Sequence, residues 1–243
     1  MAHLELFLFT WGLYPRRILI YLHEKGLFNS PHIKVTQVTI SATAEMIAPG
    51  KPKGTVPILV LPDGTFIKQS VAILDYLEDI CDKPEEAWQQ DIASAAKTSM
   101  RGSNARGRAT IREILALVDE ATSMFGFACH KGSKLFLEIE PTNSAASSMA
   151  MGIVRRNMKL LEPYYEGRFE GDSSEAEKVT IADCVFFSFL QFSRELYGVD
   201  LVADSELRNL RRFYVTFKER ESAKIPEDFY PLYIKELAPI WLE

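Results

Sequence analysis

The chain has 243 residues, of which 47% are hydrophobic, and it carries a net charge of −5 at pH 7. A chain of this size can bury a core in one large or two small domains, and its acidic balance argues against a general nucleic-acid binder, because such proteins usually carry a basic excess. No stretch approaches the about 18 uninterrupted apolar residues that span a membrane, and the first residues lack the pattern of a signal peptide, so we expect a cytoplasmic protein with no nucleic-acid and no membrane partner.

The first 80 residues have the pattern of a small α/β domain. The predicted elements are strands over 4–9, 35–40, 58–61 and 65–68 and helices over 15–25 and 69–79. Pro15 favours a first helical position and Gly26 a helix end, while Asp63-Gly64 favours a hairpin turn. The resulting order, βαβ followed by ββα, is that of a thioredoxin-like domain.

A second, helical domain is expected after a short linker. Residues 81–86 combine charge with a proline between two periodic regions, which is typical of a linker. The predicted domains are 1–80, the linker 81–86, and an all-helical domain over 87–243. The main helical blocks are expected at about 86–127, 143–166 and 179–196. The cysteines Cys81, Cys129 and Cys184 are odd in number and widely spaced, so they indicate neither a disulfide framework nor a metal site, and we expect them to be reduced.

Two short motifs of the first domain indicate a site for a small peptide. Pro57 opens an apolar run and marks a first strand position. With a cis bond before it, the N–H and C=O of Val56 would stay unpaired, and an extended peptide could add there as a short strand. Gln69-Ser70 precedes a helix, so the Ser70 hydroxyl and the free amides can bind a carboxylate. Either motif alone is also compatible with an ordinary edge strand or helix cap.

Another motif lies in the second domain. Thr180 and Asp183 predict a capping box, in which each side chain bonds the backbone N–H of the other residue, and alone this is a folding signal without chemistry. Together with 17–27, Gly54 to Pro57 and Gln69-Ser70, the Thr180-Ile181-Ala182-Asp183 stretch resembles the cytosolic glutathione S-transferase superfamily. The resemblance implies an N-terminal thioredoxin-like domain, a C-terminal helical bundle, and glutathione as cofactor.

The resemblance also implies roles for residues. Residue Val56 before a cis Pro57 would bind the cysteinyl backbone, and Gln69-Ser70 the γ-glutamyl carboxylate. Lys51 and Lys53 can reach the glycyl carboxylate, Lys53 as a displaced substitute for the lysine that the family commonly has where this chain has Thr55. Arg16 and Arg17 could hold a carboxylate too, although one of them is expected to face solvent on the first helix.

The residue that stabilises the glutathione thiolate is missing from its usual place. Family members have a Tyr, Ser or Cys after the first strand, and alignment puts the serine position on Gly12 or Leu13, which have no hydroxyl. Three alternatives remain: Thr10, which is our first choice, Tyr14, and the backbone amides before Pro15. For Tyr14 a role as an aromatic pocket wall is equally compatible.

A second substrate is expected beside Trp11, Leu13 and the first long helix of the second domain. If 99–108 is helical, Met100, Asn104 and Arg108 share a face at i, i+4 and i+8. Glycines in this stretch favour either room for a ligand or close packing across a homodimer interface, and the family is usually dimeric.

The sequence therefore predicts a glutathione transferase-like enzyme that activates the thiol for attack on an electrophilic, conjugated, hydrophobic small molecule. A glutathione-dependent cis-trans isomerase, acting by reversible thiol addition, is the enzymatic alternative, and a non-catalytic interaction module of this fold is another. The insertion-like segment 167–178 suggests a specialised member, of fungal secondary metabolism.

Overall fold

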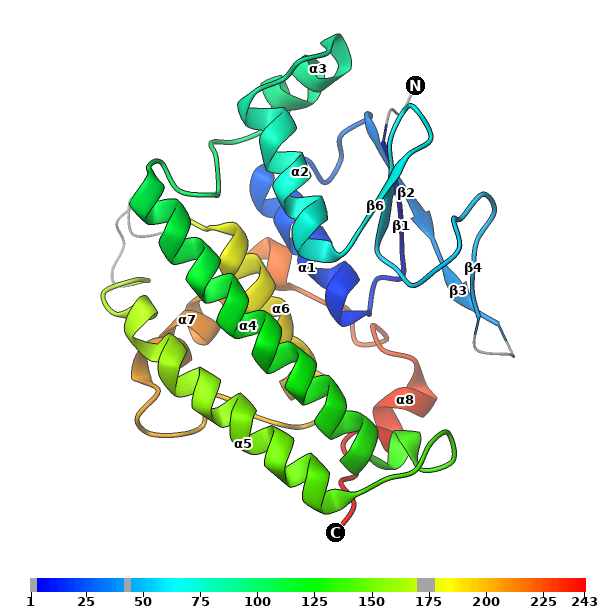
Figure 1. Cartoon of the computed structure of the whole chain (residues 1–243), viewed down its shortest axis with the longest axis vertical. Coiled ribbons are helices and arrows are strands. Elements are labelled where there is room, and N and C mark those ends of the chain that lie inside the picture. Colours follow the sequence, from blue (N-terminus) through cyan, green and yellow to red (C-terminus); the bar gives the residue numbers. More distant parts are fainter. Residues whose placement is uncertain (1–3, 42–44, 170–177) are drawn as a thin grey trace. The chain divides into compact units, whose positions relative to one another are not determined.

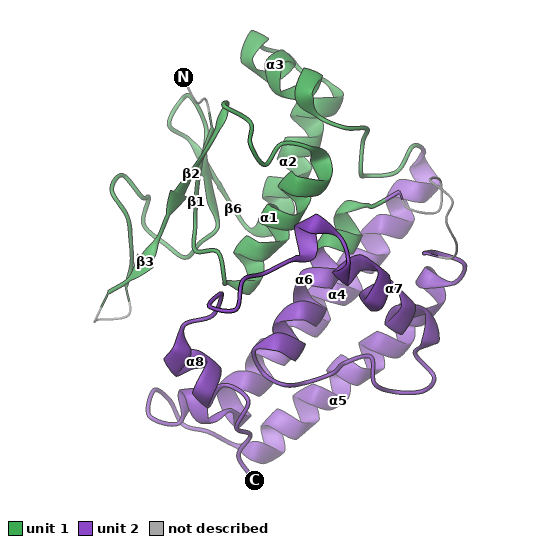
Figure 2. Ribbon diagram, turned by 180° about the vertical axis from the view of Figure 1, so that it is seen from behind, with its two compact units in different colours: residues 1–103, 179–184 green, residues 104–178, 185–243 purple. Residues whose placement is uncertain are grey.

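The computed structural model describes residues 4–41, 45–169 and 178–243, and these form two compact units (Figures 1 and 2). The first unit spans the chain up to Ser103 together with residues 179–184, and the second contains the remainder. The chain thus divides after Ser103, later than the linker expected at 81–86. The reason is that α3 (Ala87–Ala95) packs against α2 (Ser70–Asp82) in the first unit.

A four-stranded mixed sheet organises the first unit. Its strands are β1 (Leu4–Leu8), β2 (Ile33–Gln37), β5 (Ile58–Val60) and β6 (Phe66–Lys68), in the order β2-β1-β5-β6. The central strand β1 pairs in parallel with β2 and antiparallel with β5, which pairs antiparallel with β6. Helices α1 (Leu13–Lys25) and α2 lie side by side against one face of the sheet (Figure 1). The predicted thioredoxin-like fold is confirmed.

The single strand expected over 35–40 is wrong, because Val38 interrupts it. Val38 donates its N–H to the Leu8 carbonyl (2.8 Å) and is buried in a small core with Phe7 and Ile58. Past this break, β3 (Thr39–Ile40) pairs with β4 (Met46–Ile47) in a separate two-stranded sheet. A buried side chain therefore redirects the chain where alternation alone predicted continuation.

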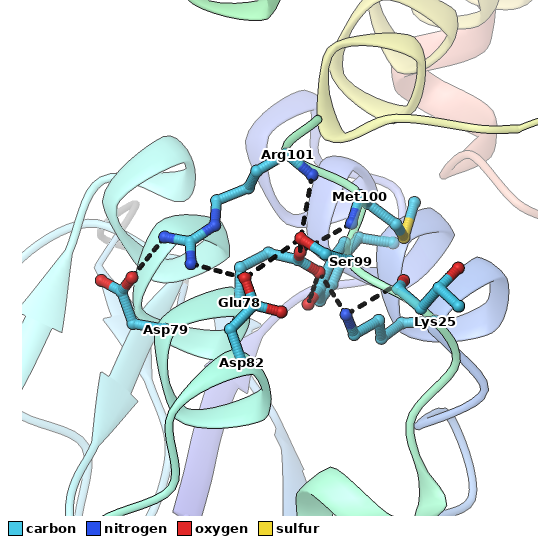
Figure 3. Close-up of polar contacts among 9 residues, drawn as sticks. Lys25, Glu78, Asp79, Asp82, Ser99, Met100 and Arg101 are labelled. Atoms are coloured by element: carbon cyan, nitrogen blue, oxygen red, sulfur yellow. Dashed lines mark hydrogen bonds and ion pairs between the residues drawn. The ribbon is translucent and has the colours of Figure 1, made fainter. Parts of the chain in front are cut away.

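Helices α1 and α2 are joined by an ion pair that is excluded from water (Figure 3). Lys25 Nζ lies 2.7 Å from Glu78 Oε1, and both side chains are 0% exposed. The Tyr21 hydroxyl donates to the same carboxylate oxygen (2.7 Å), and Lys25 Nζ also donates to the Thr98 carbonyl (3.3 Å). Burial, together with the Glu78 carboxylate, raises the pKa of the Tyr21 phenol well above its usual value, so the phenol stays a donor.

The same carboxylate holds the segment that leads out of the first unit. Glu78 Oε2 accepts the Met100 N–H (2.7 Å) and the Ser99 hydroxyl (3.1 Å). Arg101 binds both Asp79 and Asp82 on the exposed side of α2 (Figure 3). With Glu78 satisfied by four donors, the cost of burying its charge is offset by hydrogen bonds.

The second unit is helical. Its helices are α4 (Ala105–Gly132), α5 (Ser144–Leu161), α6 (Ile181–Glu195, which begins in the first unit), α7 (Arg208–Lys218) and α8 (Leu232–Leu237), with 3₁₀ turns at Lys134–Phe136, Glu162–Tyr165 and Glu221–Ala223. Aromatic rings form much of its core, and those of Phe186 and Phe213 stack with centroids 5.4 Å apart. Within the described residues, none of these helices combines the length and apolar character needed to cross a membrane.

The predicted capping box at the start of α6 is confirmed. Thr180 N donates to Asp183 Oδ2 (2.8 Å), and Asp183 N donates to Thr180 Oγ1 (3.3 Å).

All three cysteines are free, and Cys129 and Cys184 are buried. Of the insertion-like segment expected at 167–178, residues 170–177 lie outside the described part of the chain.

Replacing Glu78 by Gln tests the buried ion pair. The variant leaves the Lys25 ammonium buried without its counter-charge, so we expect the free energy of unfolding to fall by about 3–5 kcal/mol, measured by urea denaturation. The exposed Glu85→Gln is the matched control and should change stability by less than about 0.5 kcal/mol. A loss below about 1 kcal/mol in Glu78→Gln would contradict a central role for this pair.

Candidate functional site

A cavity of about 290 Å³ opens in the first unit, where α2 begins. It is bounded by the turn that leads into β5, by the end of β6 and by the first turn of α1. Its lining residues are Tyr14, Thr55, Val56, Pro57, Lys68, Gln69 and Ser70. The fold thus brings together the residues predicted to bind the cofactor, except Lys53, with one of the two side chains predicted to stabilise the thiolate.

The turn before β5 presents an unpaired stretch of backbone to this cavity. The Val56–Pro57 peptide bond is cis, as predicted. No hydrogen bond occupies the N–H or C=O of Val56 within the described residues. An extended peptide can therefore pair with Val56 through both groups, as a short added strand does.

The start of α2 presents a hydroxyl and helix amides to the same cavity. Ser70 is the first residue of the helix and is only 3% exposed. Gln69, the N-cap residue, has φ 73° and ψ 119°, a conformation that non-glycine residues rarely adopt. The first amides of a helix have no intrahelical acceptor, and the helix dipole favours negative charge there. This end of the cavity is suited to an anion.

A buried arginine lies behind Ser70, and neither its burial nor this contact was expected from the sequence. The expectation that Arg16 or Arg17 faces solvent is wrong, since both are buried, Arg17 to 1% exposure. The Arg17 guanidinium donates from Nη1 to Ser70 Oγ (3.3 Å) and lies 4.8 Å from the centroid of the Tyr14 ring. It therefore adds positive charge beneath the wall of the cavity.

A spacing of four residues was the signal that could have located this arginine. Arg17, Tyr21 and Lys25 recur at i, i+4 and i+8, so they share one stripe of α1, and all three are almost fully buried. Two of them contact Glu78, and the third contacts Ser70 at the other end of α2. Polar groups thus hold α1 against α2 along the stripe that ends at the cavity.

Two lysines hydrogen-bond to backbone carbonyls of the loop that precedes β5. Lys51 Nζ donates to the Gly54 carbonyl (2.7 Å), and Lys68 Nζ donates to the Lys53 carbonyl (2.9 Å). Lys53 lines a second cavity of about 490 Å³. Thr55 lines both this cavity and the one beside Ser70. No Asp or Glu lines the cavity beside Ser70, so its described charged groups are cationic.

In the loop after β1, the Phe9 ring lies where a side chain at position 12 would begin. A Cβ placed on Gly12 would overlap the Phe9 ring, which packs on Trp11 with centroids 4.6 Å apart. Thr10, Trp11 and Leu13 do not line the described cavity, whereas Tyr14 does and is 41% exposed. Of the two side chains predicted to stabilise the thiolate, only Tyr14 therefore lines this cavity.

The helix expected through 99–108 is wrong in its first part. Gly102 has φ 90°, outside helical values, and α4 begins only at Ala105 with Asn104 as its N-cap, whose Oδ1 accepts the Gly107 N–H (2.9 Å). Met100 is buried in the first unit, while Asn104 and Arg108 are exposed in the second. The three residues therefore do not share a helical face, and their role in a substrate pocket stays a prediction.

The part of the chain that contains the cavity is similar to a known family. Residues 11–80 match the family model of the glutathione S-transferase N-terminal domain. No curated protein matches the sequence. Among solved structures, a glutathione transferase family member from Pseudomonas fluorescens Pf-5 with bound glutathione is 19% identical, with a TM-score of 0.65 over 90% of this chain and 96% of the other.

Two further structures extend the likeness. A glutathione S-transferase from Methylobacillus flagellatus with bound glutathione is 21% identical, with a TM-score of 0.64 over 94% of this chain and 100% of the other. Gtt2 from Saccharomyces cerevisiae is 21% identical, with a TM-score of 0.65 over 90% of this chain and 98% of the other. The TM-scores show that the chain has the same fold as these proteins.

Proposed function

We propose that this protein, which has the glutathione transferase fold and an N-terminal domain of the glutathione S-transferase type, binds glutathione and activates its thiol. One observation carries the proposal: the unpaired backbone of Val56 and the buried hydroxyl of Ser70 line a single cavity at a helix N-terminus. Two of the solved structures of this fold hold glutathione, which agrees with that assignment.

The charges and hydrogen-bond donors around the cavity predict the direction in which glutathione lies. The γ-glutamyl carboxylate fits Ser70 and the first amides of α2, and the cysteinyl backbone pairs with Val56. The glycyl carboxylate then points toward Thr55, with Lys53 and Lys68 as its cationic neighbours. Because glutathione carries two carboxylates, a cavity with cationic groups at both ends is complementary to it.

The thiolate needs a donor, and Tyr14 is the side chain best placed to supply one. A free thiol titrates near about 8.5, so only a small fraction is thiolate at neutral pH. The Tyr14 phenol lines the cavity at the first turn of α1, where the helix dipole also favours negative charge. Thr10 remains the alternative.

The reaction that we propose is attack of the thiolate on an electrophilic, conjugated, hydrophobic small molecule. Reversible addition of the same thiolate to a double bond would give isomerisation, and a role in secondary metabolism is part of this finer proposal. Incubation with enones separates the reactions: an increase in the mass of the product indicates conjugation, and an unchanged mass with altered double-bond geometry indicates isomerisation.

The free state of all three cysteines supports a cytoplasmic location.

Replacing Ser70 by Ala tests the carboxylate assignment. We expect glutathione affinity, measured by calorimetry, to fall by about 1–3 kcal/mol, because a buried carboxylate loses a hydrogen bond. The exposed Ser94→Ala is the matched control and should leave the affinity unchanged. Equal affinity in wild type and Ser70→Ala would overturn the γ-glutamyl assignment.

Titration of the bound thiol identifies its donor. We expect Tyr14→Phe to raise the pKa of the glutathione thiol by about one unit, which corresponds to 1.36 kcal/mol, the typical value of one hydrogen bond. Thr10→Val should shift it less, since Thr10 does not line the cavity. Ultraviolet absorbance of the thiolate followed against pH measures both, and a larger shift in Thr10→Val would show that Tyr14 is not the donor.

A homodimer is also part of the proposal. The second unit has an apolar groove between α4 and α5, lined by Met124, Phe127, Ala146, Met149, Ala150 and Ile153. Met149 is 75% exposed and Phe127 45%, and an exposed apolar patch of this kind is typical of an association surface.

Sedimentation tests the dimer. The wild type should sediment as a dimer at micromolar concentration, and Met149→Asp should shift it to the 27.5 kDa monomer by placing a charge in the groove. Ser148→Asp, exposed beside the groove, is the control and should remain dimeric. A monomeric wild type would refute the proposal.

A further inference from the structure

Ser70 has an unusual hydrogen-bonding arrangement for a buried hydroxyl. A serine hydroxyl has one proton to donate and two lone pairs to accept. Its oxygen accepts a hydrogen bond from Arg17 Nη1 (3.3 Å), yet among the described residues no acceptor takes its proton. Because Ser70 lines the cavity and is 97% buried, its one free donor has only the cavity to point into.

We infer that Arg17 is a positioning residue, which fixes the Ser70 hydroxyl as a proton donor and thereby makes this end of the cavity specific for a carboxylate. The inference rests on the proposed glutathione site and deepens it. An arginine cannot accept a hydrogen bond, so the Ser70 oxygen cannot donate toward Arg17 and must donate elsewhere. A carboxylate oxygen accepts the proton that Ser70 donates and is attracted by the Arg17 charge. A ligand ammonium would leave that proton unused, could bind only the remaining lone pair of the oxygen, and would be repelled by the guanidinium.

The charge behind the hydroxyl acts in the same direction. Arg17 is 1% exposed, so its guanidinium is a cation held away from water. The Tyr14 ring covers it at 4.8 Å, a cation–π contact that keeps water away from the charge. In such a poorly screened site, a cation strengthens attraction to an anion bound on the other side of Ser70.

The fork of the guanidinium matters as well as its charge. Arg17 reaches from the second turn of α1 to the first residue of α2 and contacts both Ser70 and the Tyr14 ring. A lysine at this position would keep the charge but lose the planar group that stacks and donates in fixed directions. Arg17→Lys therefore separates the contribution of charge from that of geometry.

The test compares two ligands by calorimetry. One is glutathione, and the other is γ-aminobutyryl-cysteinyl-glycine, which lacks only the α-carboxylate of the γ-glutamyl residue. We expect Arg17→Gln to weaken glutathione binding about ten- to hundredfold, the range for a hydrogen bond to a charged group, and binding of the analogue less than threefold. Arg17→Lys should lie between wild type and Arg17→Gln for glutathione.

A double-mutant cycle with Ser70→Ala shows whether the two residues act as a unit. In the Ser70→Ala background, Arg17→Gln should cost clearly less than in the wild type, because the hydroxyl that it orients is gone. Equal losses for the two ligands, or additive losses in the cycle, would overturn the inference and leave Arg17 a structural residue. If Arg17→Gln does not fold, Arg17→Lys with the same two ligands and the same cycle decides it.

The wild type distinguishes this inference from the proposed function. If wild-type protein does not bind glutathione, the proposed function fails. If it binds glutathione but Arg17→Lys and Arg17→Gln bind both ligands like the wild type, only the role of Arg17 fails.

Discussion

The contact between α1 and α2 is the constraint on which the first unit depends. It carries charged groups removed from water: Lys25 is paired with Glu78 at one end, and Arg17 is bonded to Ser70 at the other. A buried charge is tolerated only with well-placed partners, which leaves few ways for the two helices to pack. Since Tyr14 belongs to α1 and Ser70 to α2, this packing sets the distance across the candidate site.

The cavity is lined by polar groups whose hydrogen-bonding capacity the local fold leaves unused. Val56 comes just before a strand, Ser70 begins a helix, and Gln69 between β6 and α2 has a rarely adopted backbone conformation. Lys68 is tied to the Lys53 carbonyl, so one of the cationic residues also fixes the loop beside the cavity. Pre-organised donors of this kind bind an anion without first having to be ordered.

Local signals in the sequence were enough for much of this unit, and long-range contacts explain the rest. The hairpin and the capping box at Thr180 follow from turn and cap residues, and the structure confirms them. It also confirms the cis Val56–Pro57 bond, which the family resemblance implied. The break at Val38, the late start of α4 after Gly102, and the burial of Arg17 depend on partners or conformations that periodicity does not report. Gly12 is similar, because only the fold reveals that the Phe9 ring fills the space of a side chain there.

The most direct test of the account is a crystal structure of the protein with glutathione. The account predicts a γ-glutamyl carboxylate oxygen at hydrogen-bond distance from Ser70 Oγ, about 2.7 Å, and the cysteinyl backbone paired with the N–H and C=O of Val56. Glutathione bound in the opposite direction, with its γ-glutamyl group beside Lys53 and its glycyl carboxylate at Ser70, would contradict the account, as would a tripeptide bound outside this cavity.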